Sequence, residues 1–216
     1  MTLGKFITFE GGEGAGKSTQ ARLLATALEA RGIACVVTRE PGGTSGAEAI
    51  RALLLGRDID IGGEGWNARA EALLFAAARS DHVERLIRPA LVQGKWVICD
   101  RFVDSSRAYQ GGGGGLTDAE VLELHRIGSG GLLPDLTLLV EVSPEVAAQR
   151  LTARDGDSPD RIGGRGASYH DAVVQAFVRF AEAEPERFTR IDGDHSADAV
   201  HLEVVSALLC MLSVPL

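Results

Sequence analysis

The octapeptide Gly-Gly-Glu-Gly-Ala-Gly-Lys-Ser at residues 11–18 constrains the fold of this chain more than any other segment. It fits the pattern G-x-x-x-x-G-K-[ST], whose glycines allow backbone N–H groups to turn inward around phosphate oxygens. A short apolar run at residues 6–9 precedes it, and leucines and alanines at helical spacing follow it to residue 31. A strand, a glycine loop and a helix N-terminus in this order form an anion site. The segment therefore predicts a nucleoside triphosphate site.

Each polar residue of this loop has an expected task. Lys17 is predicted to reach the β- and γ-phosphates, and the Ser18 hydroxyl to bind Mg²⁺. The alternative is a glycine-rich turn with a solvated lysine, which the flanking strand and helix disfavour. The residues predicted to hold ATP are Gly11, Gly12, Glu13, Gly14, Ala15, Gly16, Lys17, Ser18 and Thr19.

Apolar runs near residues 5, 35, 96, 137 and 189 predict five strands, nearly all separated by helical stretches. This alternation favours a parallel sheet with helices on both faces, the α/β fold of a P-loop NTPase. The helices are expected at residues 45–55, 67–93, 117–127, 144–154, 167–184 and 196–211, with Pro89 bending the second of them. A length of 216 residues suits one domain, residues 1–216.

Two glycine-rich segments interrupt this pattern. The run of five glycines at residues 111–115 predicts a flexible loop that becomes ordered on binding. Residues 150–166 are too charged and glycine-rich to be buried, which predicts a mobile lid that carries the cations Arg154, Arg161 and Arg165.

Composition excludes several classes of partner. A net charge of −8 argues against broad binding of nucleic acid, which needs a basic face. No uninterrupted apolar span approaches the roughly 18 residues of a membrane helix. Cys35, Cys99 and Cys210 are far apart and lack metal-ligand spacing, so we expect reduced core residues in a cytoplasmic protein.

Charged residues end two of the predicted strands, where open α/β sheets place their ligands. Arg39 and Glu40 follow the second strand, and Asp100 and Arg101 close the third. A carboxylate at the end of an apolar strand is typical of the group that orients Mg²⁺ or its water in P-loop enzymes. For Arg39 and Glu40, a solvated turn is an equally good interpretation.

The long helix at residues 67–93 combines an apolar stripe with one polar candidate. Leu73, Leu74, Ala77 and Ala78 are expected on its inner face. Phe75 and Arg79 are four residues apart and so share a face. On this spacing alone, a packed Phe beside an exposed Arg is the simpler interpretation.

A guanine-reading Asn-Lys-x-Asp motif is absent, because the sequence has Asn only at residue 67, and this disfavours a GTPase.

Further blocks of sequence resemble thymidylate kinase, and together they span nearly the whole chain. The matching blocks are residues 10–19, Thr38-Arg39-Glu40-Pro41-Gly42-Gly43-Thr44, Phe75-Ala76-Ala77-Ala78-Arg79, Asp100-Arg101-Phe102, Ala108-Tyr109-Gln110-Gly111 and Pro134-Asp135-Leu136-Thr137.

The resemblance implies transfer of the ATP γ-phosphoryl group to dTMP with Mg²⁺, on a nucleoside monophosphate kinase-like fold that is usually a homodimer. It implies that Phe75 stacks on thymine and that Arg79 bonds its O4. Arg39 and Arg101 would hold the acceptor phosphate, and Ser106, Tyr109 and Gln110 would line the sugar and base pocket. Glu40 and Asp100 would lie near the metal and phosphates, and the expected metal ligands are Ser18 and Asp100.

The implied catalytic residues are Lys17, Arg101, Arg154 and Arg161. The P-loop has no Arg while the lid has several, which resembles the bacterial type with a lid arginine. Arg154 is preferred because it ends a helix. Two alternatives stay open at this point: a kinase for another nucleotide or a deoxynucleoside, and an ATP-dependent switch protein.

Overall fold

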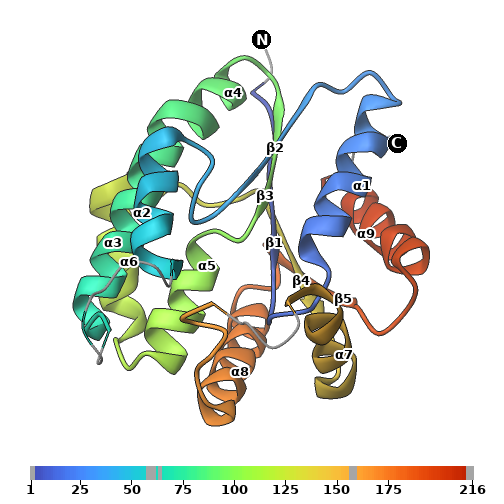
Figure 1. Cartoon of the computed structure of the whole chain (residues 1–216). Coiled ribbons are helices and arrows are strands. Elements are labelled where there is room, and N and C mark those ends of the chain that lie inside the picture. The colour runs from blue at the N-terminus through green and yellow to red at the C-terminus, as the bar shows by residue number, and fades with distance from the viewer. Residues whose placement is uncertain (1–2, 57–61, 63–64, 156–159, 213–216) are drawn as a thin grey trace.

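The computed structural model describes residues 3–56, 62, 65–155 and 160–212. Its centre is a sheet of five parallel strands in the order β2-β3-β1-β4-β5, which confirms the predicted α/β class (Figure 1). The strands are β1 (Phe6–Glu10), β2 (Cys35–Arg39), β3 (Trp96–Asp100), β4 (Leu136–Glu141) and β5 (Phe188–Asp192).

Helices cover both faces of the sheet because strand side chains point alternately to one face and the other. Ile7 and Phe9 pack with α1 (Lys17–Glu29) and α9 (Ala197–Leu212) on one face. Phe6 packs on the other face, against η1 (Val83–Ile87) and α4 (Arg88–Val92). Leu139 lies on that second face too, against α8 (Ala167–Ala183) and η2 (Arg107–Gly113). The remaining helices are α2 (Ser45–Leu55), α3 (Ala68–His82), α5 (Val103–Ser106), α6 (Asp118–Ser129) and α7 (Pro144–Asp155).

The helix expected at residues 67–93 is divided into α3, the π-helical turn η1, and α4. Pro89 explains the widened turn, since its ring would clash with the carbonyl four residues earlier and it donates no N–H bond. The predicted inner stripe was wrong in part: Leu73 is 56% exposed and Ala77 is also exposed. The buried face instead carries Glu71, Arg79 and His82, whose polar groups find partners inside the protein.

The glycine run is also not the loop that we expected, because residues 111–113 continue the π-helical segment η2. A Cβ atom on Gly112 would lie 2.6 Å from Ala176 Cβ, and one on Gly113 would lie 2.6 Å from the Tyr169 ring. These glycines let η2 and α8 approach closely. Their role here is packing.

Two expectations drawn from composition are tested by the fold. Among the described residues, no helix is both long and apolar enough to span a membrane. The three cysteines are free, but only Cys99 is buried; Cys35 is half-buried and Cys210 is exposed. The core position expected for Cys210 was wrong, because it lies on the outer face of α9.

Candidate active site

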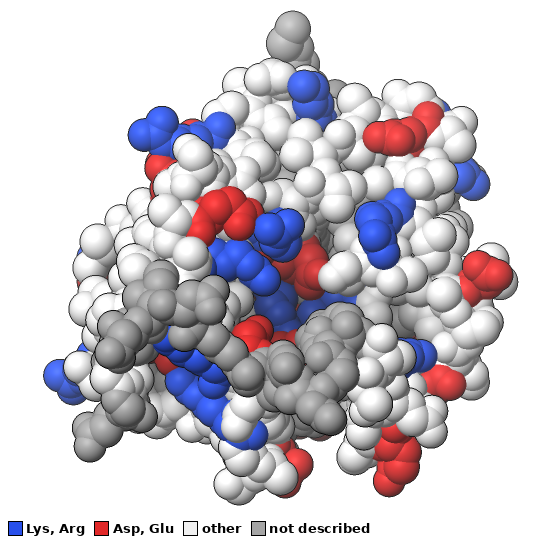
Figure 2. Space-filling model, viewed as in Figure 1, with Lys and Arg blue, Asp and Glu red and all other residues white. Residues whose placement is uncertain are grey.

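The carboxyl ends of β1, β2 and β3 meet at one edge of the sheet and open into a cavity of about 720 Å³. Strand register brings them together, since Asp100 pairs with both Phe9 and Arg39. The cavity runs from the P-loop to Phe75, Arg79 and Gln110. Figure 2 shows basic side chains gathered around this hollow, although the chain as a whole has a net charge of −8.

The P-loop has the backbone that its glycines allow. Gly14 and Gly16 have φ values of 72° and 90°, in the left-handed region. The Lys17 ammonium folds back over the loop and donates to the Gly12 carbonyl at 2.6 Å and the Gly11 carbonyl at 3.2 Å. Burial and the nearby Arg101 lower the pKa of Lys17 to about 8. An anion bound in this loop would favour the charged ammonium and so raise this pKa again.

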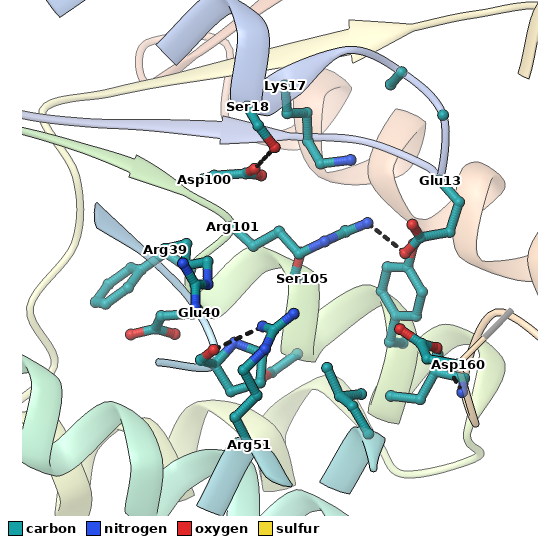
Figure 3. A pocket seen from close by; sticks show the side chains of 18 of the residues that line it. Glu13, Lys17, Ser18, Arg39, Glu40, Arg51, Asp100, Arg101, Ser105 and Asp160 are labelled. Carbon is teal, nitrogen blue, oxygen red and sulfur yellow. Dashed lines mark hydrogen bonds and ion pairs between the residues drawn. The ribbon is translucent and has the colours of Figure 1, made fainter. Parts of the chain in front are cut away.

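Ser18 and Asp100 lie together at the start of α1 and the end of β3, and the Ser18 hydroxyl donates to Asp100 Oδ2 (Figure 3). Asp100 Oδ1 is buried and has no hydrogen-bond partner among the described residues. No group of three or more His, Cys, Asp or Glu side chains forms a metal cage in that part of the chain. A hydroxyl and one carboxylate suit Mg²⁺, which keeps several waters and binds substrate phosphates. The donor set therefore fits the expected ion.

Arg101 lies at the centre of the cavity and adopts φ 68°, which is unusual for a residue with a side chain. Its guanidinium donates to Glu13 Oε1 at 2.6 Å, the Gly11 carbonyl at 3.0 Å and Ser105 Oγ at 3.1 Å (Figure 3). These contacts join the end of β3 to the P-loop. The Arg101 guanidinium therefore lies between the P-loop and the far end of the cavity.

Glu10 anchors the turn that carries Arg101. Its carboxylate accepts from the Phe102 N–H at 2.7 Å and the Ser105 hydroxyl at 2.6 Å. Burial, reinforced by Asp104, raises the pKa of Glu10 to about 7. The residue is fully buried, so its effect on the cavity passes through Ser105 and the backbone of the turn.

Arg79 is buried, and its neighbours fix its guanidinium. Its Nε donates to Glu40 Oε2 at 2.7 Å, and its Nη2 donates to Ser106 Oγ at 2.8 Å and the Phe102 carbonyl at 3.2 Å. Glu40 is held in turn by His82 Nδ1 at 3.0 Å. The structure thus places Arg79, Glu40 and Ser106 in one network, which the spacing of Phe75 and Arg79 alone did not predict.

The far wall of the cavity is aromatic and amide-bearing. Phe75, Tyr109 and Gln110 line it, and their expected contacts with a base and sugar stay predictions. The Gln110 amide nitrogen donates to Glu71 at 3.0 Å, while its carbonyl oxygen is buried without a partner among the described residues. A planar ligand with a hydrogen-bond donor at its edge would suit this wall.

The sequence analysis did not assign several residues that line the cavity, among them Arg51, Ser105 and Arg150. Arg51 of α2 lines the cavity and donates to the Pro41 carbonyl at 2.8 Å (Figure 3). Burial and the neighbouring Arg39 lower its pKa. Thr44 caps α2, which begins soon after β2 ends at Arg39. This short connection to a ligand-binding strand end is the signal in the sequence that could have identified Arg51.

The lid region is described in part. Residues 156–159 and the Arg154 side chain lie outside the described residues, so the preferred lid cation has no side-chain geometry here. Arg161 donates to the Leu53 carbonyl at 3.3 Å and Arg165 pairs with Glu71. Of the lid arginines with described side chains, Arg150 lines the cavity, and Arg161 and Arg165 do not.

Comparison with known proteins identifies the family of this chain. The thymidylate kinase family model matches residues 9–204. The chain belongs to the thymidylate kinase family. It is 54% identical over 209 residues to a thymidylate kinase from Rhizorhabdus wittichii, covering 97% of this chain and 99% of the relative. A thymidylate kinase from Bradyrhizobium sp. is 50% identical over 198 residues, with 91% and 86% of the two chains covered.

A solved structure supports the same membership. The crystal structure of thymidylate kinase from Ehrlichia chaffeensis superimposes with a TM-score of 0.76 at 33% identity, covering 95% of this chain and 99% of that one. Family membership therefore rests on both sequence and fold.

Proposed function

We propose that the protein transfers the γ-phosphoryl group of ATP to dTMP, which gives dTDP for nucleotide biosynthesis. One observation carries the proposal: a single cavity is lined at one end by the P-loop and at the other by Phe75, Arg79 and Gln110. Phosphoryl transfer between two bound nucleotides needs a site for each, in line and sheltered from water. Family membership supports the choice of acceptor.

At the donor end, the P-loop N–H groups and Lys17 bind the phosphates of ATP. Ser18 and Asp100 would hold Mg²⁺, which would neutralise charge on the β- and γ-phosphates. Arg101 lies between the two nucleotide sites and would contact both phosphate groups. Its guanidinium already donates to the Gly11 carbonyl of the P-loop and to the Ser105 hydroxyl beyond β3. Arg154 is the first candidate for a lid cation on the transferred group, and Arg161, which does not line the cavity in this structure, is the second.

At the acceptor end, Arg39 and Arg51 reach toward the cavity from β2 and α2 and would hold the dTMP phosphate with Arg101. Phe75 stacks on the base. Arg79 donates to thymine O4, since it is a donor whose orientation Glu40 and Ser106 fix.

The N3–H of thymine needs an acceptor, and the carbonyl oxygen of Gln110, which has no partner within the described part of the chain, provides one. Tyr109 and Ser106 complete the sugar and base pocket.

The experiment is a panel of acceptors with ATP and Mg²⁺, read as acceptor-dependent ADP release. The panel contains dTMP, dUMP, dCMP, dAMP, dGMP and thymidine. We expect dTMP first, dUMP about 10- to 200-fold lower in kcat/KM, and dCMP about 10⁴-fold lower. A different preferred acceptor would indicate another nucleotide kinase, and no acceptor-dependent release would indicate an ATP-dependent switch.

We further propose one domain with a lid at about residues 150–166, a cytoplasmic location and a homodimer. Exposed Leu73 on α3 and Ile127 on α6 support the dimer, since they put apolar surface on two helices that pack together.

A further inference from the structure

Glu71 is a buried carboxylate behind the base end of the cavity. It lies in the first turn of α3 and is 6% exposed, and it is not among the residues that line the cavity. Its Oε1 accepts from Gln110 Nε2 at 3.0 Å, and its Oε2 accepts from Arg165 Nη2. Glu71 therefore contacts one residue that lines the site and one that belongs to the lid segment.

The chemistry of these partners removes an ambiguity at Gln110. An amide side chain can present either its oxygen or its NH₂ group to a ligand, because the two ends have the same shape. A carboxylate accepts hydrogen bonds and donates none, so it binds the NH₂ end. Gln110 is 1% exposed, and its oxygen is the polar atom left without a protein partner among the described residues.

Arg165 strengthens this constraint. Its guanidinium donates to Glu71 and, through Nη1, to the Tyr169 hydroxyl at 2.8 Å, which itself donates to the Tyr109 carbonyl at 2.9 Å. Because guanidinium can only donate, both neighbours of Glu71 present donors to it. Arg165 thus balances the carboxylate charge, and each carboxylate oxygen of Glu71 accepts from a donor.

From this arrangement we propose that Glu71 determines base specificity without touching the base, by turning Gln110 into an obligate acceptor. The inference rests on the proposed function. Thymine carries a hydrogen-bond donor at N3, which the Gln110 oxygen can accept. Cytosine carries an acceptor at N3, so its nitrogen lone pair would face the lone pairs of the Gln110 oxygen and no hydrogen bond would form. Glu71 is a positioning residue in this scheme, and the discrimination is set before the nucleotide enters.

Glu71→Gln tests the proposal because the introduced amide has a predictable orientation. Arg165 requires an oxygen, so the introduced amide presents its NH₂ group to Gln110. Gln110 then turns its own oxygen toward that NH₂ group and its own NH₂ group toward the base. The kcat/KM ratio of dTMP to dCMP should fall by about 10- to 100-fold, from a weaker dTMP reaction and a stronger dCMP reaction.

A double-mutant cycle separates positioning from a loss of structure. With Gln110→Ala already present, Glu71→Gln should change the dTMP to dCMP ratio by less than about 2-fold. Glu123→Gln removes a carboxylate that pairs with Arg126 on the exposed side of α6, and serves as the matched control. If Glu71→Gln does not fold, Glu71→Ala leaves Gln110 free to turn and predicts a smaller fall of the same ratio.

The outcomes are distinct. A wild-type enzyme that does not prefer dTMP to dCMP refutes the proposed function and this inference with it. A wild-type enzyme that prefers dTMP, with the ratio unchanged in Glu71→Gln, overturns only the role of Glu71. The role of Glu71 is also overturned if Glu71→Gln lowers the dTMP to dCMP ratio equally in the Gln110→Ala background, because the effect would then not pass through Gln110.

Discussion

Replacing Lys17 with methionine is expected to stabilise the ligand-free fold while it abolishes phosphoryl transfer. Lys17 is 6% exposed, and its pKa falls from 10.5 to about 8 on folding. This difference corresponds to a cost of about 3 kcal/mol for the buried ammonium at neutral pH. Methionine has a similar length and no charge to desolvate.

Part of this gain is offset. The ammonium donates to the Gly11 and Gly12 carbonyls, and losing two such bonds costs about 1–3 kcal/mol in total. We therefore expect a net stabilisation of about 1 kcal/mol at pH 7. The ligand-free protein carries this cost of burying the Lys17 ammonium because the P-loop suits a phosphate anion. A bound phosphate would return the pKa of Lys17 toward its ordinary value.

The pH dependence gives the sharper test. Because the folded pKa is lowered, the unfolded chain binds the Lys17 proton between pH 8 and 10.5 while the folded protein has released it. Wild-type stability should therefore rise with pH across this window relative to Lys17→Met, by about 2 kcal/mol between pH 7 and 9.5.

Urea unfolding of both proteins, without nucleotide, measures this difference. Lys5→Met is the matched control, since Lys5 is 40% exposed and pairs with Asp135 at the surface. It should cost at most about 1 kcal/mol. A Lys17→Met protein that is less stable at pH 7, or a stability difference that does not vary with pH, would refute the reasoning. An active variant would remove Lys17 from the catalytic site.

Three further predictions concern other parts of the molecule. Arg154→Ala should lower kcat by about 10²- to 10⁴-fold with a smaller change in KM for dTMP; near-normal kcat, with an inactive Arg161→Ala, would move the catalytic role to Arg161. Asp104→Ala should destabilise the protein by about 3–5 kcal/mol in urea unfolding, because the fully buried carboxylate pairs with Arg187 at 2.6 Å and Arg107 at 2.9 Å; a loss below about 1 kcal/mol would contradict this. Light scattering at micromolar concentration should give a dimer, and a mass near 22.8 kDa would contradict the homodimer.

Local sequence determined the elements and the donor end of the site. The P-loop pattern needs only a few residues in a row, because glycine backbone freedom and a helix N-terminus act over a single turn. Alternating strands and helices likewise predicted the parallel sheet, since a parallel pair requires a crossover connection. The positions of Asp100 and Arg101 followed from the rule that ligands bind at the carboxyl ends of strands.

Tertiary structure decided what depends on contacts between distant segments. Leu73 is exposed and Glu71 buried because α3 turns its polar residues toward Gln110 and Glu40, and helical periodicity does not record where partners lie. Residues 111–113 are helical because η2 packs closely on α8, a constraint that composition cannot express. The orientation of Gln110 depends on Glu71, 39 positions away in sequence, so only the folded chain specifies which end of that amide Glu71 binds.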